Sequence, residues 1–184
     1  DFPNGWVPST FYISLIPLYE ATGDTKYLEA VKQWGGGFNW NCAPRIHNAD
    51  DIVCGQVFLD LYRHEDDFEV VEKLISRMDE VLLNAKSGSE EWYWCDALFM
   101  APPTYIRASK ILNKPEYLAF ADSMYWDVYQ HLFDENESLF YRDSKYFDKK
   151  SPNGKKVFWG RGNGWGIGGL TRQISYIDNP QMKS

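Results

Sequence analysis

Apolar residues along most of the chain recur at the spacing of amphipathic helices. The stretch from Val70 to Val81 is an example, because its apolar side chains return every three or four positions. Residues 139–147 instead alternate rings with polar groups, which predicts a short hairpin strand, and residues 151–154 (Ser-Pro-Asn-Gly) predict a turn. The helical pattern predicts helices over residues 8–21, 25–36, 50–63, 67–85, 95–111, 116–132 and 163–177.

A helix–turn–helix pattern occurs three times. Residues 18–28, 61–68 and 108–118 each close one apolar helix and open the next. The rings that anchor the second helices stand 41 and 49 residues apart, at Tyr27, Phe68 and Tyr117. A period of this length with two helices per unit is typical of stacked helical hairpins.

The predicted helices alternate in character. Those beginning near residues 50, 95 and 163 are rich in small residues and rings, whereas the helices between them are more charged. An inner ring of helices backed by an outer ring is an α/α toroid, and six such hairpins need roughly 250–300 residues. The sequence therefore predicts an all-α toroid, as a single domain over residues 1–184 from which the C-terminal helices are missing.

Composition and charge narrow the classes of partner. The chain has 19 basic and 26 acidic residues, a net charge of −7 and no recognisable Lys/Arg cluster, which argues against nucleic acid. No apolar run approaches the ~20 residues that a membrane span needs. Aromatic residues make up 17% of the chain, which suits either a sugar-stacking site or an aromatic core.

The three cysteines are widely spaced, with no zinc pattern and no disulfide framework. The cysteines do not decide the cellular compartment of the protein. Unpaired thiols suit a reducing bacterial cytoplasm, whereas loss of a leader before Asp1 would suit a periplasm.

Residues with catalytic potential gather at the starts of the predicted inner helices. They lie in residues 47–51, 92–103 and 158–166. Inner helices of a toroid run in the same direction, so their N-termini meet at one mouth. The partial positive charge of those N-termini favours an anionic ligand there.

Asp96 is the strongest candidate for a general acid. It lies between Trp94 and Phe99, so desolvation and a second nearby carboxylate should raise its pKa, against the opposing effect of the helix N-terminus. A helix-capping role is the equal alternative. Of the neighbouring pair, we assign Asp50 to the helix cap and Asp51 to the pocket, because one carboxylate suffices as a cap.

Other readings of these segments are weaker. Arg161 suits a bidentate contact with a substrate carboxylate, or equally a structural salt bridge. A metal site at His47, Asp50 and Asp51 lacks a ligand cluster from a third element, and we expect neither metal nor cofactor. The glycines of residues 160–164 lack the Lys-Ser/Thr ending of a phosphate loop.

Four motifs, in order along nearly the whole chain, resemble the unsaturated rhamnogalacturonyl hydrolases, glycoside hydrolase family 105, and more distantly the unsaturated glucuronyl hydrolases of family 88. They are Tyr-Glu-Ala-Thr-Gly-Asp at 19–24, Asp50-Asp51 with Gly55-Gln56, Trp-Cys-Asp-Ala-Leu-Phe-Met-Ala-Pro-Pro at 94–103, and Arg-Gly-Asn-Gly-Trp at 161–165.

The resemblance implies an (α/α)6 barrel and a reaction that hydrates a double bond. A 4,5-unsaturated galacturonic acid, left at the non-reducing end by a pectin or rhamnogalacturonan lyase, is protonated at C4 and takes up water at C5. The hemiketal then opens and releases the next sugar, typically rhamnose. The substrate is thus a small oligosaccharide.

The resemblance also implies roles for single residues. The catalytic aspartate of the family falls on Asp96 and its partner on Asp51, with Asp50 as the alternative. The Arg and Trp of the last motif fall on Arg161 and Trp165. We add the neighbouring side chains of the matched segments to the expected substrate contacts, namely His47, Asp50, Trp94 and Met100.

The chain departs from the family pattern at one position. Many members carry His after Tyr in the strand before the last motif, and here Tyr141 is followed by Arg142. We expect Arg142 to take over contact with the substrate carboxylate. The preferred uronide and leaving sugar stay open.

Two rival functions remain. A sugar epimerase on the same toroid would use paired histidines, but only His47 of the three histidines lies near the mouth. A non-catalytic helical-repeat scaffold or sugar-binding module would fit the repeats. Such a module has no need of Asp96 between rings with Arg161 opposite.

Overall fold

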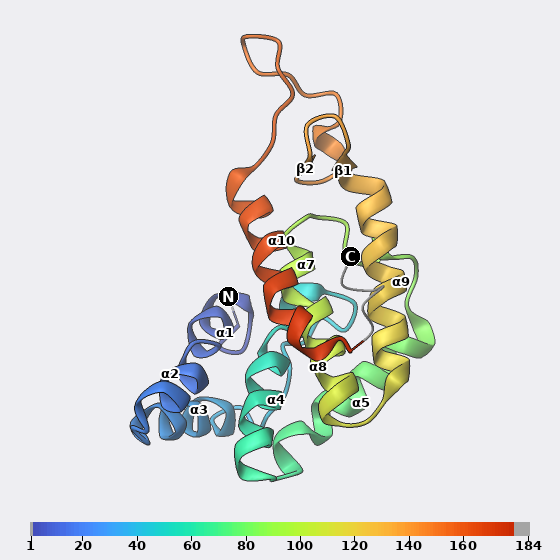
Figure 1. Ribbon diagram of the computed structural model, residues 1–184. Helices are drawn as coiled ribbons and strands as arrows, with labels where there is room; N and C mark the ends of the chain where they lie inside the picture. The colour runs from blue at the N-terminus through green and yellow to red at the C-terminus, as the bar shows by residue number, and fades with distance from the viewer. Residues whose placement is uncertain (1, 179–184) are drawn as a thin grey trace.

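The computed structural model describes residues 2–178, and this part of the chain is almost wholly helical (Figure 1). The helices are α1 (Trp6–Tyr12), α2 (Leu15–Thr22), α3 (Lys26–Gly36), α4 (Cys54–Glu65), α5 (Glu69–Asn84), α6 (Gly88–Glu91), α7 (Ala97–Met100), α8 (Pro102–Ile111), α9 (Pro115–Leu132) and α10 (Gly160–Gln173). Short 3-10 turns form η1 (Ala49–Asp51), η2 (Ser144–Tyr146) and η3 (Ile174–Tyr176), and the strands are β1 (Phe133–Asp134) and β2 (Leu139–Phe140).

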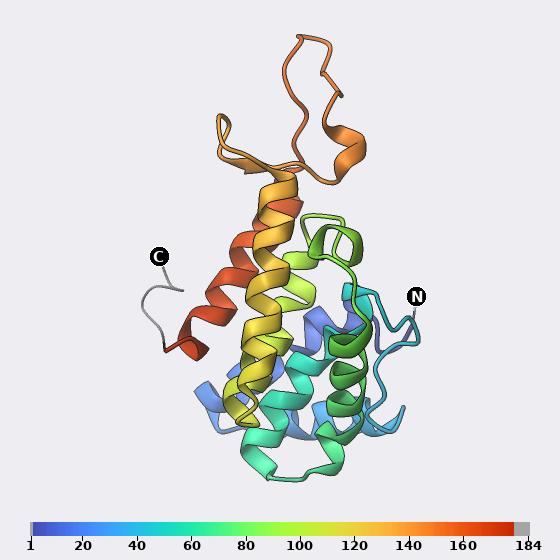
Figure 2. The ribbon, with the colours of Figure 1, turned by 90° about the vertical axis from the view of Figure 1, so that its right-hand side faces the viewer.

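Inner and outer helices alternate along the chain, as expected. Helix α4 packs on α8, and α8 packs on α10, while α5 and α9 pack behind α4 and α8 respectively. Figures 1 and 2 show the long outer helix α9, which packs on the inner helix α8. Apolar faces of both layers form one buried core. Within residues 2–178, no helix combines the length and apolar character that a membrane crossing requires.

Two of the predicted helices are each divided in the structure. The expected helix 8–21 is broken at Ile13 and Ser14 into α1 and α2. The expected helix 95–111 is broken at Ala101, because Pro102 and Pro103 have no N–H to donate to the carbonyls of the preceding turn. The break separates the short α7, at the mouth, from α8, which continues into the core.

The expected strand over residues 139–147 is largely wrong. Only Leu139 and Phe140 form a strand, paired with β1, and the chain then turns into η2, where the Asp143 side chain accepts a hydrogen bond from the Lys145 N–H (3.0 Å). The turn at 151–154 is confirmed. Gly154 has φ +78°, and the Ser151 N–H donates to the Lys155 carbonyl (2.8 Å).

Glycines let α10 approach α7 closely. A Cβ placed on Gly169 would lie 2.2 Å from the Leu98 carbonyl oxygen, and one on Gly162 would lie 2.6 Å from the Cys95 sulfur. Neither position has room for a side chain. Gly162 and Gly169 therefore form the surface of α10 that packs on the segment of α7.

A buried polar cluster ties the three inner helices together. Asp60 of α4 forms an ion pair with Arg107 of α8, and Arg172 of α10 lies 3.6 Å from the same carboxylate. Burial lowers the pKa of Arg107 to about 10, with a further contribution from Arg172. Gln56 of α4 accepts a hydrogen bond from Arg172 (2.6 Å) and donates one to the Phe99 carbonyl (2.9 Å), which the prolines leave without a helical donor.

We expect Gly169→Ala to lower the Tm of the full-length protein by several degrees. The new methyl group meets a backbone carbonyl, and overpacking of this kind costs about 1–3 kcal/mol. Gly164→Ala is the matched control, because nothing lies within 4 Å of its Cβ position and alanine favours the helix. Thermal denaturation followed by circular dichroism measures both. Equal Tm values for the two variants would contradict the close packing of α10 on α7.

Candidate active site

The candidate site lies where three inner-helix N-termini meet. They are preceded or formed by the turn η1 before α4, the short helix α7 and the first turn of α10, and Figure 1 shows α7 beside α10. Helix α7 packs on both α10 and η1. The structure thus brings the segments of Asp50, Asp96 and Arg161 together, although they are far apart in the sequence.

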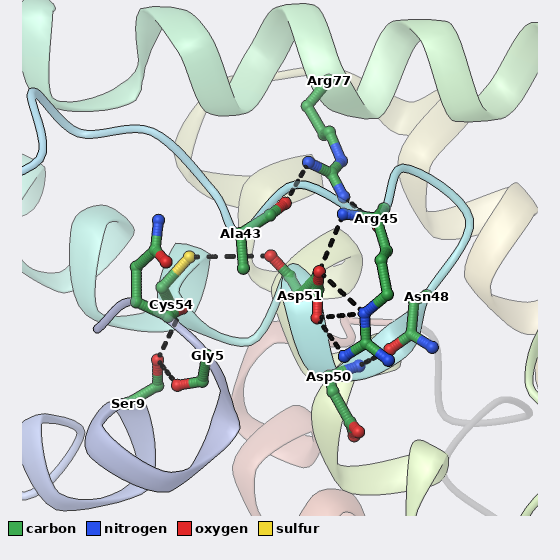
Figure 3. Close-up of polar contacts among 10 residues, drawn as sticks. Gly5, Ser9, Ala43, Arg45, Asn48, Asp50, Asp51, Cys54 and Arg77 are labelled. Atoms are coloured by element: carbon green, nitrogen blue, oxygen red, sulfur yellow. Dashed lines mark hydrogen bonds and ion pairs between the residues drawn. The ribbon is translucent and has the colours of Figure 1, made fainter. Parts of the chain in front are cut away.

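Asp51 does not face this mouth. Its side chain is completely buried, and its carboxylate accepts hydrogen bonds from the Arg45 guanidinium (2.5 and 3.1 Å) and the Arg45 N–H (2.8 Å). Arg77 in turn donates to the carbonyls of Ala43 and Arg45 (Figure 3). Asp51 therefore holds the loop before η1 in shape, and its expected catalytic role stays a prediction.

Asp50 points away from the Arg45–Asp51 pair in Figure 3. The cap of η1 is Asn48, whose side chain accepts from the Asp50 N–H (3.1 Å), so the expected capping role of the Asp50 carboxylate is also wrong. The Asp50 side chain lines a hollow of about 360 Å³ with Phe2, Trp6 and Arg45. Burial, and then the negative charge of Asp96, raise its pKa to about 6.

Asp96 lies at the N-cap position of α7, yet its side chain caps nothing. Its Oδ1 atom is buried without a hydrogen-bond partner among the described residues. Burial raises the pKa of this carboxyl, against the lowering effect of the Arg142 and Arg161 guanidinium groups. A buried carboxyl oxygen with no partner is costly, which is typical of a group that functions with a ligand.

A second hollow, of about 440 Å³, lies between the loop after β2 and the start of α10. Arg142, Tyr146, Trp159 and Arg161 line it. The Arg161 guanidinium lies 4.8 Å from the centre of the Trp159 ring, and that of Arg142 lies 5.7 Å from the same ring. Both positive charges thus lie within cation–π range of one ring.

Backbone pairing brings this hollow to Asp96. Trp94 forms a β-bridge with Asp143, and the Cys95 N–H donates to the Arg142 carbonyl (2.9 Å). The pairing sets Arg142 beside the segment that carries Asp96.

The other expected contacts divide into two groups. Trp94 and Trp165 are half-buried near the mouth, and the Trp165 ring packs on Phe99 with centroids 4.6 Å apart. Met100, however, is only 1% exposed and belongs to the core, and His47 is held by Glu91 (Nδ1 to Oε2, 3.1 Å) at a separate small hollow. The expected substrate contacts of Met100 and His47 are not supported by these positions.

Several residues of the two hollows were missed from the sequence. Phe2 and Trp6 come from the N-terminal segment, and Tyr146 comes from the long loop before α10, whereas Trp159 lies within the expected segment 158–166. Excess aromatic composition was the only signal for them. Arg45 lies six residues before Asp51 in the loop that leads to η1. The sequence does not indicate which of the two adjacent aspartates it pairs with, and the structure shows that it pairs with Asp51.

The residues at the mouth do not resemble a metal centre. Among residues 2–178, no group of three or more His, Cys, Asp or Glu side chains is arranged to hold a metal ion.

We expect Asp50→Asn to raise Tm at pH 8, because it removes a buried charge that Asp96 repels. The folded pKa, about 6, lies above the ordinary value of 3.8, so this destabilisation develops as pH rises through 6 and should vanish near pH 4. Asp51→Asn, the adjacent control, should lower Tm at pH 8, because it weakens a charge-assisted pair with Arg45. Thermal denaturation between pH 4 and 8 measures both. If Asp51→Asn instead had the higher Tm at pH 8, Asp51 would be the destabilising buried charge and Asp50 the stabilising one, which would contradict this assignment.

Known proteins share this architecture. An unsaturated 3S-rhamnoglycuronyl hydrolase of Formosa agariphila is 32% identical over 96% of this chain and 52% of its own length. A glycosyl hydrolase of family 88 from Bacteroides vulgatus superposes with a TM-score of 0.91 at 24% identity, over 98% of this chain and 57% of its own. A family 105 glycoside hydrolase of C. acetobutylicum superposes with a TM-score of 0.73 at 19% identity, over 94% of this chain and 54% of its own.

These structures confirm the all-α fold of the (α/α)6 barrel class. The chain spans about half the length of the curated relatives that it matches. The model of Glycosyl Hydrolase Family 88 matches residues 2–184, nearly the whole sequence, and the chain therefore belongs to that family.

Proposed function

We propose that this chain carries the catalytic mouth of a glycosidase that hydrates a 4,5-unsaturated uronic acid at the end of a rhamnose-containing oligosaccharide. One observation carries the proposal. The Oδ1 atom of Asp96 is buried without a hydrogen-bond partner, and the Asp96 carboxyl interacts electrostatically with a second carboxyl of raised pKa, that of Asp50, and with the Arg142 and Arg161 guanidinium groups. The names of the relatives, which are unsaturated rhamnoglycuronyl and rhamnogalacturonyl hydrolases, agree with this chemistry.

Asp96 is the proposed proton donor. Its carboxyl proton forms the new C–H bond at C4 of the enol ether, and positive charge develops at C5 and the ring oxygen. Water adds to C5 and gives up a proton to a carboxylate, for which we propose Asp50, because its carboxyl interacts electrostatically with that of Asp96. The resulting hemiketal opens and breaks the bond to the next sugar.

Arg142 and Arg161 are the proposed ligands of the uronate carboxylate. In the free protein their positive charges lower the pKa of Asp96. A bound carboxylate would offset those charges, so the pKa of Asp96 rises when the substrate is in place. The donor is then protonated where it is needed, at the enol ether.

Aromatic rings supply the proposed sugar-stacking surfaces. The Trp159 ring lies within cation–π range of the Arg142 and Arg161 guanidiniums, and the Trp165 ring packs on Phe99. Sugar C–H faces stack on such rings, while the polar edges of the sugar stay free to bond. Trp6, beside Asp50, is a further surface of this kind.

The rival functions have less support. An epimerase needs paired histidines, but His47 is bonded to Glu91, His64 to Glu20, and the His131 ring packs on Phe147. A scaffold offers no reason to bury a carboxyl oxygen without a partner.

Asp96→Asn in the full-length protein should abolish turnover while leaving the fold intact. Asparagine keeps the shape but delivers no proton, and loss of a general acid reduces kcat about 10²–10⁴-fold. Turnover of the unsaturated disaccharide from lyase-treated rhamnogalacturonan is measured as the loss of its near-ultraviolet enol absorbance. KM should change little. Near-normal kcat with unchanged Tm would exclude Asp96 as the donor.

Asp50→Asn should move the alkaline limb of the kcat/KM profile to lower pH. The donor must be protonated, and a neighbouring negative charge helps to keep it so, because repulsion between two carboxylates is mutual. Without that charge Asp96 ionises at lower pH, and activity falls earlier as pH rises. Initial rates across pH 4–9 measure the shift. A limb that stays in place would show that Asp50 does not influence the donor.

A further inference from the structure

The loop between β2 and α10 carries a charge opposite to that of the rest of the chain. Residues 142–161 contain seven basic side chains (Arg142, Lys145, Lys149, Lys150, Lys155, Lys156 and Arg161) and two acidic ones, Asp143 and Asp148, a net charge of +5. The whole chain carries −7, so the other residues sum to −12. The expectation that the sequence holds no basic cluster is therefore wrong for this loop.

The loop is an ordered projection. Figures 1 and 2 show it extending beyond the helices at the end where α10 begins. Its tip is closed by a β-bridge between Lys150 and Lys156, and Ser151 bonds to the Lys155 carbonyl through both its N–H (2.8 Å) and its hydroxyl (3.0 Å). The Lys156 ammonium at this bridge pairs with Asp134 of β1 and so ties the loop to the hairpin.

Most of the basic side chains are not neutralised by the protein. Lys156 pairs with Asp134, and Arg142 lies 3.8 Å from Asp143. No ion pair within residues 2–178 involves the remaining five, which are Lys145, Lys149, Lys150, Lys155 and Arg161. A concentration of exposed, unpaired positive charge attracts polyanions.

The positive charge continues from the catalytic mouth to the tip. Arg161 and Arg142 stack near Trp159, Arg142 donates to the Tyr146 hydroxyl (3.3 Å), and the Lys149 ammonium lies 3.9 Å from the centre of the Tyr146 ring. Cations and rings thus alternate from the hollow beside Asp96 out along the loop. This alternation suits a sugar chain with acidic groups, since sugar faces stack on rings and acids pair with cations.

We propose that the loop of residues 142–161 binds the acidic sugar chain that extends beyond the scissile bond, and so makes the enzyme prefer longer polyanionic oligosaccharides. The inference rests on the proposed function. An enzyme that holds the terminal unsaturated sugar in its pocket must let the rest of the oligosaccharide leave by the open mouth, and the loop projects there.

The test compares two triple variants of the full-length protein that change net charge equally. Lys149→Gln/Lys150→Gln/Lys155→Gln removes charge from the loop. Lys26→Gln/Lys86→Gln/Lys110→Gln removes it from α3, from the segment after α5 and from α8. The substrates are the unsaturated disaccharide and the unsaturated hexasaccharide from lyase-treated rhamnogalacturonan, the latter carrying further uronic acids.

We expect the loop variant to lose about 3- to 10-fold in kcat/KM on the hexasaccharide, with disaccharide kinetics unchanged. The control variant should match the wild-type protein on both. Added salt should reduce the wild-type preference for the hexasaccharide and affect the loop variant little, because salt screens exposed charges. An unchanged ratio of hexasaccharide to disaccharide activity in the loop variant would overturn the proposal.

A binding measurement separates this inference from the proposed function. Calorimetry with saturated hexagalacturonate, which has no enol ether to hydrate, should show salt-sensitive binding to the wild-type and control proteins and weaker binding to the loop variant. That result without disaccharide turnover would leave the loop a polyanion site and reject the proposed reaction. Equal binding of hexagalacturonate by all three proteins would overturn the inference. It would also be overturned if the loop variant differed from the wild-type protein only in sedimentation, because the loop would then mediate self-association.

Discussion

The buried carboxylate of Asp60 determines how the inner helices stand relative to one another. A charge removed from water must be matched by opposite charge and hydrogen bonds, and here the match comes from Arg107 and Arg172 on two other helices. The cluster thereby links α4, α8 and α10 to one another in the core. Helix α7, which carries Asp96 at its N-cap position, packs on both α8 and α10, so the core contact also supports the candidate site.

Two adjacent aspartates have different surroundings because they lie in a tight turn. Consecutive residues of the 3-10 turn η1 point about 120° apart, so Asp51 faces the Arg45 loop while Asp50 faces the mouth. The pattern of the sequence cannot rank them, since both are acidic and both precede α4. Their difference arises from Arg45, whose position depends in turn on Arg77 of α5.

Periodicity predicted the helical layers well because burial of apolar faces governs them, and the long helices α5 and α9 appear close to the expected ranges. It failed where local chemistry prevails. Consecutive prolines divide α7 from α8, and the Asp143 side chain turns the expected strand into η2. The motif around Asp96 could be placed from sequence, but the partners that line its two hollows come from the N-terminus and the loop before α10, whose pairing no periodicity reveals.

The glycines of α10 also affect the order in which the mouth assembles. Six of its first ten residues are glycine, and each lowers helix stability by roughly 1 kcal/mol relative to alanine. This segment is therefore too weak a helix to persist alone, and it becomes helical only by docking on α7 through Gly162 and Gly169. Arg161 and Trp165, which α10 carries, take up their positions in that same docking event, so a partly folded molecule would hold Asp96 without the cation that faces it.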